Sequence, residues 1–188
     1  EKIVLLAVFL PVLAGQSVPV LTLGGYSADS ALIGDSVLTG WNSRAEAITR
    51  FARGVGAAHL GNVNEARAGG ERLGELEAAT RKAGEDLFAR NVRVLRLELN
   101  AWLAHVERQG ESSVALMREA AELEASTPKH AVTPGPILPA HELLGDLLME
   151  QKQPAEALAA YKRSLELYPR RFNSLLGAGA VALAVRAD

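Results

Sequence analysis

The sequence predicts an all-α protein built from antiparallel helix pairs, and three observations support this prediction. From Asn42 onward, apolar residues recur at steps of three and four, which is the period of an amphipathic helix. Most breaks between these runs are only a few residues long, so neighbouring helices must run antiparallel. Small residues also recur at a fixed spacing, which indicates that the helix pairs are repeated units.

The composition is that of a globular chain, and it excludes several kinds of chemistry. The 188 residues are enough for one domain with a hydrophobic core. A net charge of −2 and an aromatic content of 5% argue against a nucleic-acid-binding protein, which usually has a basic excess and stacking side chains. The absence of cysteine excludes disulfides, iron–sulfur clusters, thiolate zinc sites and cysteine nucleophiles, and leaves the redox compartment open.

Residues 1–42 differ in composition from the rest of the chain, so we expect a boundary between residues 42 and 43. Only four of the 42 charged side chains (20 Lys and Arg, 22 Asp and Glu) lie in this segment. Its first run, EKIVLLAVFLPVLAG, is shorter than the roughly 20 residues of a membrane-spanning helix, so no span is expected. We expect an ordered, packed apolar segment. The core of a secretory signal, or a leader foreign to the domain, are the alternatives.

The first three helices follow from caps and apolar periodicity. Asn42 and Ser43 are expected to cap a helix over RAEAITRFARGVGAAHL. GNVNEA interrupts the pattern and restarts it, so a second helix is predicted through EARAGGERLGELEAATRK. The third helix is predicted at about 86–108, because its inner stripe is continuous. That stripe consists of Val92, Leu95, Leu99, Trp102, Leu103 and Val106.

Four more helices are predicted after Gln109-Gly110 ends the third. Ser112 and Ser113 are expected to cap a helix over VALMREAAELEAS. The segment TPKHAVTPGPILP, residues 127–139, contains four prolines and a glycine and must therefore be a loop. The remaining helices are predicted at about 138–150, at about 154–168 and from about residue 171.

The segment LPAHELLGDLLMEQKQPAEALAAYKRSLELYPRR resembles a tetratricopeptide repeat, a hairpin of two packed helices. Gly145 and Ala157 are small because the two helices cross there, and Tyr161 fills the volume before the next hairpin. Pro169 ends the second helix. His141 and Leu148 replace the large aromatics that the family usually carries on the first helix. The residues that carry the resemblance are Leu144, Gly145, Ala157, Tyr161, Ser164 and Pro169.

The same spacing recurs on both sides of this unit. Gly179 follows Gly145 by 34 residues, and Gly54 and Ala66 are spaced like Gly145 and Ala157. Ala115, after Gly110, would be the corresponding small residue of the middle unit. The resemblance therefore extends over residues 43–188 and implies a short right-handed α-solenoid of antiparallel helix hairpins. This part also resembles the C-terminal part of a group of bacterial tetratricopeptide proteins, which would fit either the cytoplasm or the periplasm.

Two other interpretations of the region around residue 141 involve metals. HELLGDLL nearly spells the zinc-protease motif His-Glu-x-x-His, but Gly145 stands where the second histidine is required. His130 and His141 flank the Pro-rich loop and could join a carboxylate in a two-histidine, one-carboxylate site. The alternative function is therefore a metal-binding or small-ligand-binding site at residues 127–141. Solvated or capping histidines are the simpler interpretation.

The sequence contains no motif for catalysis or for a cofactor. It has no Gly-x-Ser-x-Gly elbow, no phosphate-binding loop and no dinucleotide-binding motif after a strand. We therefore expect no enzymatic activity and no cofactor. The resemblance implies instead a scaffold protein that binds a protein or peptide.

In such solenoids the inner wall of the groove is built by residues of the first helices. On this chain the resemblance implies that Glu142 and Asp146, one helical turn apart, face the groove and favour a neutral or basic ligand. The alternative is that both carboxylates are simply solvated. The last helix has no following helix in the sequence to cover it. We expect residues 1–42 to fold back on the core, or two chains to pair, through such an apolar face. The expected groove residues are His59, Asn100, Glu142, Asp146 and Asn173.

Overall fold

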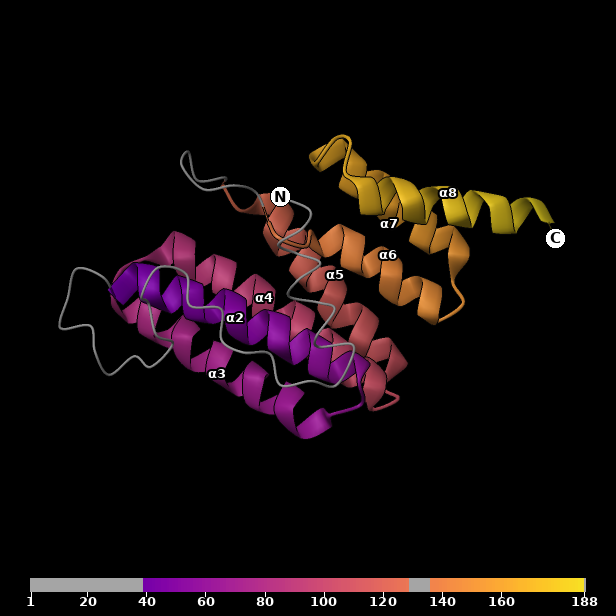
Figure 1. Ribbon diagram of the computed structural model, residues 1–188. Coiled ribbons are helices and arrows are strands. Elements are labelled where there is room, and N and C mark those ends of the chain that lie inside the picture. The colour runs from indigo at the N-terminus through magenta and orange to yellow at the C-terminus, as the bar shows by residue number, and fades with distance from the viewer. Residues whose placement is uncertain (1–38, 129–135, 188) are drawn as a thin grey trace, which may run out of the picture.

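The computed structural model describes residues 39–128 and 136–187, and within these ranges the chain forms only α-helices (Figure 1). The prediction of an all-α solenoid is confirmed. Four of the expected helices agree with the structure to within about two residues at each end. The seven helices of the described residues are α2 (Thr39–His59), α3 (Val63–Lys82), α4 (Asp86–Val106), α5 (Gly110–Ser126), α6 (Ala140–Glu150), α7 (Pro154–Leu167) and α8 (Phe172–Ala187).

Two of the expected helix starts are wrong. The first helix, α2, already begins at Thr39, so Asn42 and Ser43 lie inside it and do not cap it. The helix α5 begins at Gly110 with Gln109 as its N-cap. Ser113 is buried inside that helix, where its hydroxyl donates to the carbonyl of Gly110 at 2.7 Å. The structure expected for residues 1–38 lies outside the described residues.

The helices stack as three hairpins followed by one more helix (Figure 1). The hairpins are α2 with α3, α4 with α5 and α6 with α7, and each helix packs against the next one in the chain. The first helices of successive hairpins also touch each other, α2 with α4 and α4 with α6, and α6 touches α8 in the same way. A row of first helices in mutual contact is the arrangement of a helical-repeat solenoid.

Each hairpin turns at one residue with a left-handed backbone. These residues are Gly61, Arg108 and Lys152, with φ of 74°, 65° and 60°. After each of them, a backbone N–H reaches back five residues to a carbonyl of the first helix, which closes a Schellman turn. The three bonds are Asn62 N to Ala57 O at 2.8 Å, Gln109 N to Ala104 O at 2.9 Å and Gln153 N to Leu148 O at 2.9 Å.

These turns fix the register of the repeat. Seven residues before each left-handed residue, the first helix carries a small buried residue, and five residues after it the second helix carries another. The two sets are Gly54, Ala101 and Gly145 on the first helices, and Ala66, Ser113 and Ala157 on the second.

The middle hairpin corrects the sequence-based assignment of Ala115. Ser113 is the residue of this hairpin that matches Ala157, whereas Ala115 is exposed and lines an open depression of about 450 Å³. The prediction missed this because Arg108 is not glycine and so gave no sign of a left-handed turn. The spacing between the hairpin turns is also longer than 34 residues, since Arg108 follows Gly61 by 47 residues and Lys152 follows Arg108 by 44. The first interval contains the long helices α3 and α4, with 20 and 21 residues, and the second contains the Pro-rich segment.

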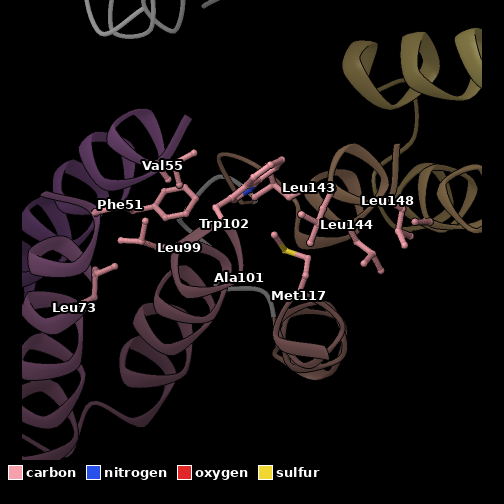
Figure 2. Close-up of a cluster of buried hydrophobic side chains, with 14 of the residues drawn as sticks. Phe51, Val55, Leu73, Leu99, Ala101, Trp102, Met117, Leu143, Leu144 and Leu148 are labelled. Carbon is pink, nitrogen blue, oxygen red and sulfur yellow. The ribbon is translucent and has the colours of Figure 1, made fainter. Parts of the chain in front are cut away.

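The main hydrophobic core runs without a break through all three hairpins. Figure 2 shows Phe51 and Val55 of α2 beside Leu99 of α4, with Trp102 extending toward Leu143 of α6. Burial of side chains of this size contributes about 1.5–3 kcal/mol each, so the core holds the hairpins together. No helix within residues 39–128 and 136–187 is long and apolar enough to cross a membrane.

Candidate functional site

One row of side chains crosses the first helices of all three hairpins. His59 of α2 packs its ring on Trp102 of α4, with ring centroids 4.3 Å apart. His105, one turn further along α4, meets the same indole edge-on at 5.8 Å. The Nε2 atom of His105 lies 2.9 Å from Oε2 of Glu150 on α6. We call these four residues, together with Asp146, the first-helix wall.

His59 adds no positive charge to the wall near neutral pH. Loss of water from the ring of His59 lowers its pKa below the ordinary value, and the nearby His105 lowers it further. The carboxylate of Glu150 opposes this shift without cancelling it. His59 is therefore neutral at pH 7, and the exposed carboxylate of Glu150 dominates the charge at this end of the wall.

Asp146 is held by its own hairpin. The hydroxyl of Tyr161 on α7 donates to Oδ1 of Asp146 at 2.7 Å. Burial raises the pKa of Asp146 above its ordinary value, and this hydrogen bond lowers it in part. The Tyr161 ring lies between two glycines, since a Cβ added to Gly145 or to Gly177 would come within 2.5 Å of it. Tyr161 thus packs α7 against both α6 and α8.

The expectation that Glu142 faces the groove is wrong. Its side chain is only 1% exposed and accepts hydrogen bonds from residues at the start of α8. Arg171 Nε and Ser174 Oγ donate to the same carboxylate oxygen at 2.9 and 2.6 Å, and Asn173 Nδ2 donates to the other at 3.4 Å. The two carboxylates expected to face the groove, Glu142 and Asp146, are therefore both engaged within the protein. Asn173 itself is exposed.

Asn100 also lies elsewhere than expected. It is half-buried and points to α3, because a Cβ added to Gly70 would come 2.6 Å from its Oδ1. Two residues correspond to about 200° around a helix, so Asn100 and Trp102 necessarily face nearly opposite directions. The wall residue of α4 that sequence reasoning missed is thus Trp102, together with His105. Trp102 was predicted as part of the apolar inner stripe of its helix, and no signal in the sequence singled out His105.

The comparison with known families agrees with this geometry at the third hairpin. Residues 139–171 match the family model described as a tetratricopeptide repeat. These residues form a tetratricopeptide repeat. It comprises α6, α7 and the turn to α8, with Leu144, Gly145 and Ala157 buried inside it. Pro169 lies in the turn after α7.

Tetratricopeptide repeats are modules for binding other proteins, and those of this family are generally not enzymes. No match was found among curated proteins or among solved structures. The match covers one hairpin, and the other two share its register of turns and small residues. The protein therefore carries an interaction module in an all-helical solenoid.

A buried glutamate lies on α4 next to the wall, one turn before Trp102. Neither oxygen of Glu98 has a hydrogen-bond partner among the described residues, and the same holds for the indole N–H of Trp102. Full burial raises the pKa of Glu98 well above the ordinary carboxyl value, and the charge of Glu124 raises it further. Burial therefore favours the protonated form of Glu98 in the folded protein. Sequence reasoning missed it, although it interrupts the apolar inner stripe between Leu95 and Trp102.

The metal site considered for the Pro-rich loop has no support in the described part of the chain. His130 lies outside the described residues. His141 precedes the buried core of the tetratricopeptide repeat; burial lowers its pKa, and its Nδ1 has no partner among the described residues. Within residues 39–128 and 136–187, no three His, Cys, Asp or Glu side chains are grouped so that they could hold a metal ion.

Proposed function

We propose that the protein is a non-enzymatic scaffold that binds a protein or peptide along the first-helix wall. The tetratricopeptide repeat at residues 139–171 supports binding as the kind of activity. The observation that supports the first-helix wall as the site is the continuous row of His59, Trp102, His105 and Glu150 across three helices. A surface shared by several repeats offers an extended, rigid site of the kind that peptides occupy.

The charge of the wall favours a neutral or basic ligand. Glu150 is exposed and its carboxylate forms a hydrogen bond only with the ring of His105 among the described residues, whereas the charge of Glu142 is balanced by the buried ion pair with Arg171. An exposed ion pair between Glu150 and a ligand lysine or arginine is worth about 0.2–1 kcal/mol, so the preference is modest and weakens with added salt. The sequence-based hypothesis of a neutral to basic ligand therefore remains, but it now depends on Glu150.

A titration with peptides of matched length tests this charge preference. We expect the wild-type chain to bind a basic peptide more tightly than its acidic counterpart. Glu150→Gln should reduce that preference. The matched control is Glu166→Gln, which removes an exposed carboxylate from α7, the second helix of the third hairpin. This control should leave the preference for the basic peptide unchanged. Equal affinities, or tighter binding of the acidic peptide, would refute the charge assignment.

A second experiment tests the wall as the binding site. His59→Ala combined with His105→Ala removes both rings that flank Trp102, and it should abolish binding of any peptide that the wild type selects from a library. Circular dichroism establishes that the variant is folded. Retention of binding by the folded variant would place the site elsewhere.

Elemental analysis of the purified protein tests the alternative function, a metal-binding site at residues 127–141. One stoichiometric metal ion would favour that function over the scaffold.

A further inference from the structure

The contact between His105 and Glu150 joins α4 to α6 across the first-helix wall. The two side chains are 23% and 48% exposed, so both can be reached from solvent. A carboxylate oxygen only accepts hydrogen bonds, so Nε2 of His105 donates to Oε2 of Glu150 at 2.9 Å even when the imidazole is neutral. The second proton of the ring therefore binds at Nδ1, and it turns this hydrogen bond into an ion pair with the same geometry.

Glu150 can serve a ligand while His105 is neutral. Its other oxygen, Oε1, has no partner among the described residues, so a lysine or arginine of a bound peptide can pair with this carboxylate. Protonation of His105 neutralises the same carboxylate and places a positive charge beside the cation of the ligand. Like charges on neighbouring side chains repel by about as much as opposite charges attract. The proton and the ligand cation therefore compete for Glu150.

Two further titratable groups of the wall lie near this pair. His59 of α2 is affected by the charges of both Glu150 and His105, but loss of water from its ring lowers its pKa, so it gains a proton less readily than an ordinary histidine. Asp146 lies one turn before Glu150 on α6. Burial raises the pKa of Asp146, so it loses negative charge as the pH falls. Asp146 therefore acts in the same direction as His105, and an experiment must separate the two.

Two arginines of the other helices packed against α4 are engaged in pairs of their own. Arg67 of α3 pairs with Glu107, which lies two residues beyond His105 and so about 200° around the helix. Arg118 of α5 pairs with Glu156 of α7. The charge available at Glu150 therefore depends mainly on His105.

We propose that His105 makes peptide binding on the first-helix wall dependent on pH, because its proton and a basic residue of the ligand compete for Glu150. This inference rests on the proposed function. Histidine is the side chain that ordinarily changes its charge between about pH 5 and 8, so the wall accepts a lysine or arginine near neutral pH and binds it more weakly as the pH falls. Because such coupling is reciprocal, a basic peptide that binds at about pH 6.5 displaces protons from the protein.

Calorimetric titration of the full chain with one capped peptide tests this competition. Lysines are its only charged residues, so its own charge is the same at about pH 7.5 and about pH 5.5. We expect the wild type to bind it about threefold or more weakly at the lower pH. His105→Gln retains a donor for Glu150 but cannot gain a proton, so it should lose most of this pH dependence although it retains Asp146. The matched control is His141→Gln, a histidine of α6 outside the wall, which should keep the pH dependence of the wild type.

The outcomes separate this inference from the proposed function. A wild type that binds the basic peptide at neither pH refutes both. Equal affinity at the two pH values, or the same pH dependence in His105→Gln as in the wild type, overturns the inference alone. Loss of all binding by His105→Gln at about pH 7.5 also contradicts it, because glutamine offers Glu150 the same donor as the neutral ring. Titrations at about pH 6.5 in two buffers of different ionisation enthalpy measure the displaced protons, and a wild type that releases none overturns the inference as well.

Discussion

Arg171 holds the buried carboxylate of Glu142 at 2.9 Å, and this ion pair joins the start of α6 to the start of α8. The same guanidinium donates through Nη2 to the carbonyl of Ile137 at 2.7 Å, so it also fixes the end of the Pro-rich segment. A carboxylate that is 1% exposed depends on such donors, since water cannot replace them.

Removal of Arg171 should therefore be costly. Arg171→Ala leaves the charge of Glu142 without its cation, and we expect a loss of about 3 kcal/mol in the free energy of unfolding. Arg163→Ala, which breaks the exposed pair with Glu166, is the control and should cost about 0–1 kcal/mol. Urea denaturation measures both. Equal losses in the two variants would show that the buried pair is not special.

Ala157 tests the packing of the tetratricopeptide repeat. It is fully buried, so Ala157→Leu should overpack the contact and cost about 1–3 kcal/mol. Ala159→Leu adds the same atoms at an exposed position of α7 and should change stability by less than about 0.5 kcal/mol. Thermal unfolding compares the two. An Ala157→Leu variant that unfolds no earlier than the wild type would argue against this register.

Glu98 should make stability depend on pH. The folded protein keeps its proton at pH values where the unfolded chain, with a carboxyl pKa near 4.5, has released it. The stabilisation is complete below that pKa and falls as pH rises toward the raised value, by up to about 1.4 kcal/mol per pH unit. Glu98→Gln should remove this decline, whereas Glu119→Gln, at an exposed position, should retain it. Stability curves that stay parallel for wild type and Glu98→Gln between pH 5 and 8 contradict the assignment.

Lys152 should be replaceable by glycine with a gain in stability. Its φ of 60° strains any side chain by about 1–2 kcal/mol, and glycine removes that strain at an entropic cost of about 0.5–1 kcal/mol. We expect a net gain of roughly 0.5–1 kcal/mol for Lys152→Gly. Lys162→Gly, inside α7, should instead lose about 1 kcal/mol. Guanidinium unfolding measures the change in the free energy of unfolding for both variants. A loss of stability in Lys152→Gly would mean that the lysine side chain makes a compensating contact.

The helices could be predicted because their information is local. Apolar periodicity and the Pro-rich break need only neighbouring residues, and Tyr161 could be placed from its own repeat. The burial of Glu142 could not be predicted, because its partner Arg171 lies 29 residues further on. The spacing of Glu142 and Asp146 shows that they share a helix face, but it does not show what covers that face. The turn at Arg108 was missed for a different reason. Its left-handed backbone is imposed by the hairpin, while arginine gives no local sign of it.

The repeats differ in the length of their second helices, yet one stretch of their first helices has a constant length. The stretch from each small residue of a first helix to its left-handed turn is seven residues in all three hairpins, while the second helices have 20, 17 and 14 residues. Changes in the length of the second helices therefore leave this stretch of the first helices in phase. Chains of this kind can lose or gain helical turns in their second helices without shifting the first-helix wall, which lies entirely within that stretch.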